Sequence, residues 1–315
     1  MKYNFNEGKS MSLAENTLNN CLQNEFNQET LQFSRLETFS MVAAINQADS
    51  TVASAIQQVL PAIADAIDAI AERLKLGGRL FYVGAGTSGR LAVLDSAECP
   101  PTFGTSPELV QSIIAGGQEA MLKAVENIED STEASVDELK KRHLCEKDVV
   151  IGIAASGRTP FTLSGVEYGN KIGALTVAIT TRGRGLLSEI AQYVIAPDVG
   201  AEVLSGSTRM KSGTAQKMIL GMLSTCVMAR LGRIHTNLMV DVVASNIKLL
   251  RRAERIVGEV CGIDIETAAQ LLKQVDYHPR RAILMYELHI NAQQATEIVQ
   301  QHPHTTLDSM LEIHR

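Results

Sequence analysis

The sequence predicts a doubly wound α/β domain built on a parallel sheet, with a helical arm before it and a small helical module after it. Five short, almost continuously apolar runs alternate with amphipathic helical stretches, a pattern typical of parallel strands buried on both faces. A Gly-rich turn directly follows the first run, and both ends of the chain show only helical patterns. Ligands of such a domain bind at the carboxyl ends of the strands.

The elements before the sheet are helical. Residues 1–49 are polar and rich in Asn, and we expect them to form an arm that folds onto a larger body. From residue 50 onward, apolar side chains recur at helical spacing as far as Leu74, and Gly77-Gly78 ends the pattern. This spacing predicts one continuous helix before the first strand.

The sheet region alternates strands with helices. Strands are predicted at 79–83, 109–115, 149–154, 175–180 and 193–196. A short helix follows the first strand, and Pro100-Pro101 are expected to end it. Further helices are predicted near 118–128, 133–142, 160–171 and 184–191.

The chain turns helical after Val203. A long helix from Ser207 through Arg230 is apolar on more than one face, so a core or a partner must cover it. Other helices are predicted at Val240–Arg252, Ile265–Val275 and Pro279–Leu288. We therefore expect three parts: an arm at 1–49, the sheet domain with its flanking helices at 50–250, and a module at 251–315 that begins with a charged run.

Composition limits the partners. The net charge is −6 and Lys and Arg form no long run, so nucleic acid is not expected. No segment approaches the roughly 18 uninterrupted apolar residues of a membrane helix, and the first residues lack the apolar stretch of a signal peptide. The five cysteines are scattered without C-x-x-C spacing, which favours reduced thiols and a cytoplasmic protein.

The segment Leu80–Thr102 is the most informative part of the sequence. Its Gly84–Gly89 turn matches the G-x-G-x-x-G pattern, but the next strand ends in Gly116-Gly117 without the acidic residue that holds a ribose. No Gly-Lys-Ser/Thr of a Walker loop follows either. Thr87 and Ser88 instead place hydroxyls at a helix N-terminus, which suits a phosphate. A phosphate cradle for a small molecule is favoured over a nucleotide site.

Two further turns carry hydroxyl groups. Ser156, Arg158 and Thr159 follow the third strand, and Pro160 is suited to begin a helix. Ser207 lies in the third turn, Ser205–Thr214, which also contains cations. Because all three turns are expected at one edge of the sheet, they predict a phosphosugar pocket.

Carboxylates are the best candidates for acid–base chemistry. No histidine precedes His143, and the other six lie in the helical tail without a carboxylate cluster, so neither histidine catalysis nor a metal site is expected. Glu98 stands just before the two prolines, and Asp95 one turn earlier is placed to orient it or to cap the helix. Glu126 and Glu129 are expected to share one helix face. No cofactor is predicted.

Four segments together carry a family resemblance: GAGTSGR, SAECPPTFG, IAASGRTPF and GAEVLSGSTRMKSGTAQK. They resemble the N-acetylmuramic acid 6-phosphate etherases, a family within the sugar isomerase (SIS) group. The resemblance implies an SIS fold, a cytoplasmic homodimer and a ubiquitin-associated-like C-terminal module. It further implies cleavage of the D-lactyl ether of N-acetylmuramic acid 6-phosphate into N-acetylglucosamine 6-phosphate and D-lactate. The family's two essential glutamates fall on Glu98 and Glu129.

This activity agrees with the residues found. In the open-chain sugar, a base can remove the C2 proton beside the aldehyde while an acid protonates the departing lactate oxygen at C3. We expect Glu98 to be the acid and Glu129 the base, a division of roles that different surroundings can create. Two alternatives remain, an aldose–ketose isomerase and a phosphosugar-sensing regulator. The related phosphosugar-sensing regulators are much longer and contain two SIS domains, whereas this chain has room for one. A transcriptional SIS regulator would carry a basic helix-turn-helix at its N-terminus, and residues 1–50 show none.

Overall fold

A five-stranded parallel sheet forms the centre of the protein. The structure is a computed structural model that describes residues 26–125 and 127–315. The strands are β1 (Leu80–Gly84), β2 (Val110–Ile114), β3 (Val149–Ile153), β4 (Leu175–Ile179) and β5 (Tyr193–Ile195), in the order β2-β1-β3-β4-β5. Every neighbouring pair is parallel. The predicted fold class and all five strands are thereby confirmed, with small differences at the strand ends.

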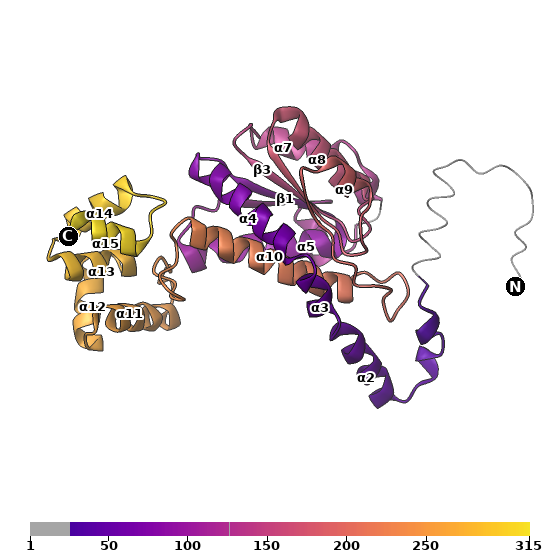
Figure 1. The fold of residues 1–315 in the computed structure, drawn as a ribbon, viewed down its shortest axis with the longest axis horizontal. Coiled ribbons are helices and arrows are strands. Elements are labelled where there is room, and N and C mark those ends of the chain that lie inside the picture. Colours follow the sequence, from indigo (N-terminus) through magenta and orange to yellow (C-terminus); the bar gives the residue numbers. More distant parts are fainter. Residues whose placement is uncertain (1–25, 126) are drawn as a thin grey trace, which may run out of the picture.

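Helices cover both faces of the sheet (Figure 1). One face carries α4 (Leu60–Lys75), α5 (Gly86–Phe103) and α10 (Lys211–Arg230), and the other carries α7 (Ala134–Lys141), α8 (Pro160–Ile172) and α9 (Leu186–Ile190). Successive strand residues serve the two cores in turn: Leu80 and Tyr82 pack in the first, Phe81 and Val83 in the second. Both faces are thus buried, as the apolar runs predict.

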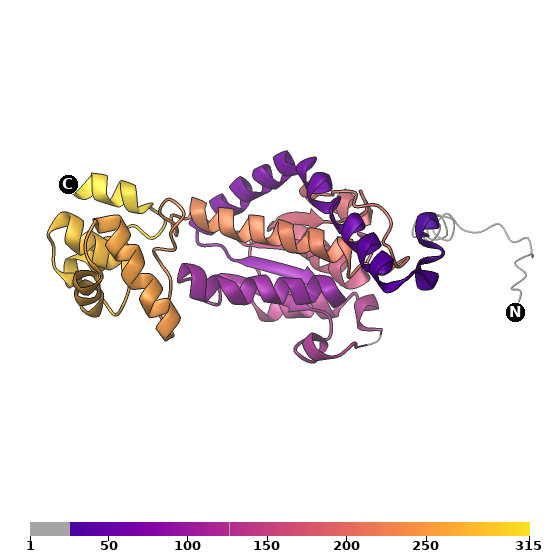
Figure 2. The ribbon, with the colours of Figure 1, turned by 90° about the horizontal axis from the view of Figure 1, so that it is seen from below.

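Helix α10 lies between α4 and α5 along the first face (Figure 2). Its side chains Ile219, Leu223 and Val227 are fully buried in the core beneath the sheet. The helix begins at Lys211, because residues 205–210 form a turn that leads into it, and not at Ser207 as predicted.

The helix predicted from residue 50 to Leu74 is broken. The chain forms α3 (Val52–Gln57) and then α4, with a break at Gln58 and Val59. Pro61 lies in the first turn of α4, where its missing N–H costs nothing, so a new helix begins there.

The segment around 118–128 was predicted wrongly as one helix. Helix α6 is only Glu119–Leu122, and Asn127 adopts a left-handed conformation, φ 60°, before the 3-10 turn η3 (Ile128–Asp130). Glu129 therefore lies on η3. Glu126, which was predicted to share its helix face, lies outside the described residues.

The two adjacent prolines do not end α5, contrary to the prediction. The helix continues through Pro100 and Pro101 to Phe103 and ends at Gly104, whose φ of 61° suits glycine. Only two helical hydrogen bonds are lost to the prolines, and Gly104 N–H donates to the Pro100 carbonyl at 2.9 Å.

A second core gathers the C-terminal helices, which are α11 (Ile247–Cys261), α12 (Ile265–Lys273), α13 (Pro279–Leu288), α14 (Ala292–Gln301) and α15 (Leu307–His314). The helix predicted at Val240–Arg252 begins only at Ile247 and continues to Cys261, because residues 240–246 are not helical and the Asn246 side chain caps α11. The expected domain limit at 250–251 falls within α11, and Val240 already belongs to this second core.

A buried ion pair fixes the chain between the two cores to α13. The Arg280 guanidinium donates two hydrogen bonds of 2.8 Å to the Asp241 carboxylate, and both side chains are almost fully buried. Val243 N–H donates to the Pro101 carbonyl of α5 at 3.1 Å. The chain between the two cores is therefore fixed to the C-terminal end of α5. No helix in the described ranges is long and apolar enough to cross a membrane.

Candidate active site

A polar cavity of about 480 Å³ lies at the carboxyl ends of β1 and β3. Three of its walls come from the turn after β1, the turn after β3 and the loop before α10, and η3 closes the fourth side. The predicted residues that line it are Thr87, Ser88, Ser156, Arg158, Thr159 and Glu129. Residues that the sequence analysis did not single out also line it, notably Asp130, Gly206 and Thr208.

Two helix N-termini border this cavity. Helix α5 begins at Gly86 and lines the cavity with Gly86, Thr87 and Ser88. Helix α8 begins at Pro160, which lines the cavity but has no N–H, so this helix contributes the positive end of its dipole. The first N–H groups of a helix have no partner within it, and its dipole favours negative charge at this end. The arrangement suits a phosphate group.

Gly157 shapes the turn between β3 and α8. Its φ is +67°, and a side chain there would place a Cβ 2.9 Å from Thr180 Cγ2. A glycine is required, and the exposed Ser156 and half-buried Thr159 flank it at the cavity.

The Ser88 side chain is hydrogen-bonded to α10. Its side chain is buried, and its Oγ donates to Gln216 Oε1 at 3.0 Å. The Nε2 of Gln216 is buried and has no partner within the described part of the chain. The Ser88 hydroxyl hydrogen is therefore already used, whereas its oxygen can still accept a hydrogen bond.

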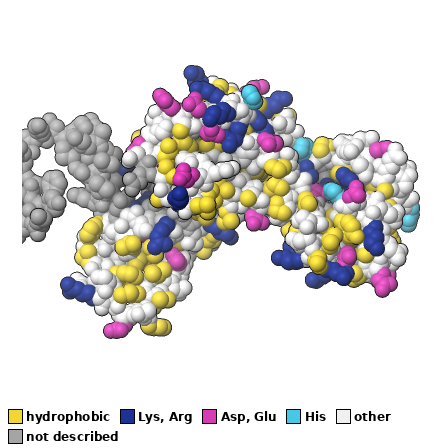
Figure 3. Space-filling view, turned by 180° about the vertical axis from the view of Figure 1, so that it is seen from behind, with side chains coloured by type: hydrophobic (Ala, Val, Ile, Leu, Met, Phe, Trp, Pro, Cys, Tyr) yellow, Lys and Arg dark blue, Asp and Glu magenta, His cyan; other side chains and the backbone are white. Residues whose placement is uncertain are grey.

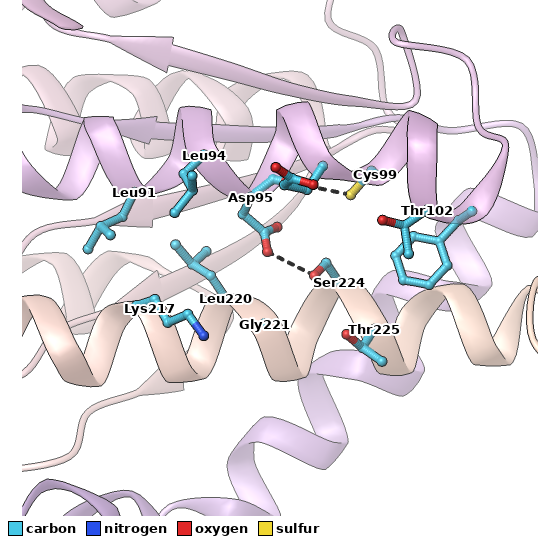
Figure 4. A pocket seen from close by; sticks show the side chains of 12 residues that line it. Leu91, Leu94, Asp95, Cys99, Thr102, Lys217, Leu220, Gly221, Ser224 and Thr225 are labelled. Atoms are coloured by element: carbon cyan, nitrogen blue, oxygen red, sulfur yellow. Dashed lines mark hydrogen bonds between the residues drawn. The ribbon is translucent and has the colours of Figure 1, made fainter. Parts of the chain in front are cut away.

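Glu129 and Glu98 do not line the same cavity. Glu98 lines an apolar groove of about 220 Å³. The groove lies between α5 and α10 (Figure 4). Leu91, Leu94 and Phe103 form the α5 side of this groove, and α10 contributes the other side. Glu98 is twelve residues beyond Gly86 on a single helix, so about 18 Å separate the two positions. Both glutamate side chains are exposed.

The Asp95 side chain is hydrogen-bonded to β1 and to α10, and it makes no hydrogen bond to Glu98. Its carboxylate accepts a hydrogen bond of 2.9 Å from Tyr82 OH and another of 2.9 Å from Ser224 Oγ (Figure 4 shows the latter). Burial raises the pKa of Asp95, and the two hydrogen bonds offset part of this effect. Burial also raises the pKa of the neighbouring Cys99 to about 12, which keeps it a neutral thiol. Asp95 thus joins β1 and α10 to α5.

Ser207 lies beside the cavity, while its neighbours Gly206 and Thr208 line it. It is half-buried, and its N–H donates to the Leu204 carbonyl at 2.9 Å. Its predicted contact with substrate stays a prediction.

Glu202, which was not predicted from the sequence, holds the loop before α10 in place. The carboxylate is fully buried and accepts hydrogen bonds of 2.9 Å from the backbone N–H groups of Lys211 and Ser212. It therefore caps α10 from nine and ten positions earlier in the chain. The only sequence signal was an acidic residue inside an otherwise apolar segment, Val199–Val203.

Comparison with known proteins agrees with the fold described above. Residues 62–170 match the family described as glucokinase regulatory protein N-terminal SIS domain. A phosphoheptose isomerase structure from Francisella tularensis, 18% identical, covers 62% of this chain and all of its own, with a TM-score of 0.50. The fold and the matched region define an SIS-domain protein.

Relatives in sequence narrow the class to one family. An N-acetylmuramic acid 6-phosphate etherase from Clostridium beijerinckii is 50% identical over 278 residues, which cover 88% of this chain and 91% of the relative. A relative of the same name from Pasteurella multocida is 52% identical over 85% of this chain and 89% of its own. The chain belongs to the N-acetylmuramic acid 6-phosphate etherase family.

The buried cap of α10 leads to a prediction about stability. In Glu202→Gln, one carboxylate oxygen becomes an amide NH₂ that faces a backbone N–H, so one buried donor loses its acceptor. We expect the free energy of unfolding to fall by about 1–3 kcal/mol, measured by urea denaturation. Glu312→Gln, at an exposed position on α15, is the control and should match the unmodified protein. A Glu202→Gln protein of unchanged stability would show that the cap contributes nothing.

Proposed function

We propose that this protein cleaves the D-lactyl ether of N-acetylmuramic acid 6-phosphate, giving N-acetylglucosamine 6-phosphate and D-lactate. The observation that carries the proposal is the identity of about half of all residues with etherases along most of the chain. The polar cavity at two helix N-termini supports it, because such a site suits the phosphate of a small sugar. The proposal includes a cytoplasmic setting, where this phosphosugar would be recycled.

The reaction is an elimination followed by a hydration. In the open-chain sugar, a base removes the proton at C2, and the electron pair of that C–H bond forms a C2=C3 double bond. The C3–O bond breaks, and an acid gives its proton to the departing lactate oxygen. Water then adds across the double bond, with its hydroxyl at C3 and its proton at C2.

The phosphate is proposed to bind at the two helix N-termini. Thr87, Ser156 and Thr159 offer hydroxyl donors there, Ser88 offers an acceptor or a reoriented donor, and the Arg158 guanidinium carries a positive charge. Glu129 is at the side of the same cavity, across from these turns, and is proposed as the base at C2.

Glu98 cannot reach this sugar within its own chain, because about 18 Å of helix separates it from the phosphate cradle. We propose that a second copy supplies it. In a two-fold dimer each contact occurs twice, with residues exchanged. If the α5 helices of two copies pack antiparallel with the axis near residue 92, each Glu98 reaches the other copy's Gly86 turn.

The surface around that axis suits such a homodimer. Leu91 and Leu94 line the groove on either side of residue 92, and Leu94 is 51% exposed in the single chain. Met218 and Met222 on α10 are also partly exposed and pack against the same core. Covering these apolar side chains favours association.

The reaction itself is tested by its products. Incubation with N-acetylmuramic acid 6-phosphate in ¹⁸O-labelled water should release D-lactate that keeps the original ether oxygen, and should place ¹⁸O at C3 of the glucosamine product. An isomerase or a sugar sensor would release no lactate. Label in the lactate hydroxyl would mean cleavage on the lactyl side and would contradict the elimination.

The two glutamates are tested by neutral replacements. Glu98→Gln and Glu129→Gln should each lower kcat by a factor of about 10² to 10⁴, the usual contribution of a positioned acid or base. Glu133→Gln, an exposed neighbour of η3 that lines neither cavity, is the control and should keep full activity. Near-normal turnover in either catalytic variant would remove that glutamate from the mechanism.

The phosphate cradle is tested at Ser156, whose side chain is exposed at the cavity. Ser156→Ala should weaken binding of N-acetylglucosamine 6-phosphate by about 10- to 100-fold, the value of a hydrogen bond to a charged group. Ser106→Ala, in the exposed turn before β2, is the control. Equal affinities of the Ser156→Ala and unmodified proteins, measured by calorimetry, would exclude Ser156 from the phosphate site.

A further inference from the structure

The N-terminal arm is anchored beside the active-site cavity. Its described part, residues 26–49, contains η1 (Gln28–Thr30), η2 (Phe33–Arg35) and α2 (Thr38–Asp49). Asn27 Nδ2 donates to the Glu202 carbonyl at 3.0 Å, and Thr30 Oγ1 donates to the Val203 carbonyl at 2.8 Å. These contacts hold residues 27–30 of the arm against the segment that leads to Gly206 and Thr208 of the cavity wall.

Helix α2 projects from the protein beyond the start of α10 (Figures 1 and 2). None of its residues is buried. Phe39 is 84% exposed and Val42 is 61% exposed, and apolar side chains gather on the protruding part in Figure 3. The sole charged residue of the helix is Asp49.

Such a helix needs a partner. Helices of about 12 residues are marginal in water on their own, and packing of an apolar face supplies most of their stability. A helix that faces solvent permanently would instead carry many charged side chains. The exposed apolar side chains of α2 thus indicate a surface that is covered in the assembled protein.

We propose that α2 docks on a second copy of this chain, at the end of the α5–α10 groove formed by Thr102, Phe103 and Thr225. This inference rests on the proposed dimer. When α5 and its partner run antiparallel, the start of α10 in one copy lies near the end of α10 in the other. Helix α2 leaves its own fold at the start of α10 and so continues over that end of the partner's groove.

The docking site also fits the proposed position of Glu98. The groove end beside Thr102 and Phe103 is the part that carries Glu98. Gly221 on α10 has no atom within 4 Å of the place where a Cβ would be, so another helix can approach closely there. The arm of one copy would cover the glutamate that the other copy contributes to its cavity.

Photocrosslinking tests this contact directly. Phe39 is replaced by p-benzoylphenylalanine, and ¹⁴N- and ¹⁵N-labelled chains are mixed and irradiated. We expect crosslinks between position 39 of one isotope form and residues 91–103 or 217–225 of the other. The same probe at Ile313, an exposed position on α15, is the control and should give no crosslink to these segments. Crosslinks only within one chain, or none, would overturn the proposal.

A second measurement follows dimer affinity. The double variant Phe39→Ser, Val42→Ser should raise the dimer dissociation constant at least about tenfold in sedimentation experiments, because two apolar side chains lose their buried site. Ile313→Ser should leave it unchanged. An unchanged dimer dissociation constant in the double variant would contradict the docking of α2. An unmodified protein that stays monomeric would contradict it as well. Neither measurement uses substrate, so failure of the etherase activity would be seen separately.

Discussion

The rigidity of α5 is the constraint on which the arrangement of the active site depends. Its first turn is pressed against the sheet: a Cβ at Gly89 would lie 2.7 Å from the Gly84 carbonyl oxygen and 2.6 Å from Ile114 Cγ1. The helix runs unbroken for 18 residues, from Gly86 to Phe103. One end forms part of the phosphate cradle and the other carries Glu98. Because a helix cannot shorten, the two groups stay apart within one chain.

Helix α10 is joined to α5 by hydrogen bonds near both the cradle and Glu98, so the two helices form one rigid layer. The pair Ser88–Gln216 ties the beginning of α10 to the cradle, and Asp95–Ser224 ties its middle to α5 and, through Tyr82, to the sheet. Buried hydrogen bonds of this kind fix register, since leaving one polar group unpaired is costly. The cavity and the groove therefore lie at two ends of one rigid layer, formed by α5 and α10. The same layer of a second copy, packed antiparallel, can place its Glu98 beside the phosphate cradle of the first copy.

Apolar runs were sufficient to predict the sheet, and hydroxyl-rich turns were sufficient to predict which loops meet at its edge. Local patterns failed where a distant contact decides the outcome. Prolines usually end helices, yet α5 passes through Pro100 and Pro101, and its end is held by Val243. The cap of α10 by Glu202 depends on the fold of the intervening loop, which carries no periodic signal. The separation of Glu98 from Glu129 follows from the twelve residues of α5 between Gly86 and Glu98, a distance that the predicted helix already implied.

Complementation between inactive subunits tests directly whether the two glutamates of one site come from different chains. Chains carrying Glu98→Gln are co-expressed with chains carrying Glu129→Gln, and the mixed dimers are assayed for D-lactate. Random pairing makes half of the dimers mixed, each with one intact pair of glutamates, so activity should recover to about a quarter of the unmodified enzyme. If both glutamates acted from the same chain, every site would lack one of them, and the mixture would stay as inactive as either variant alone.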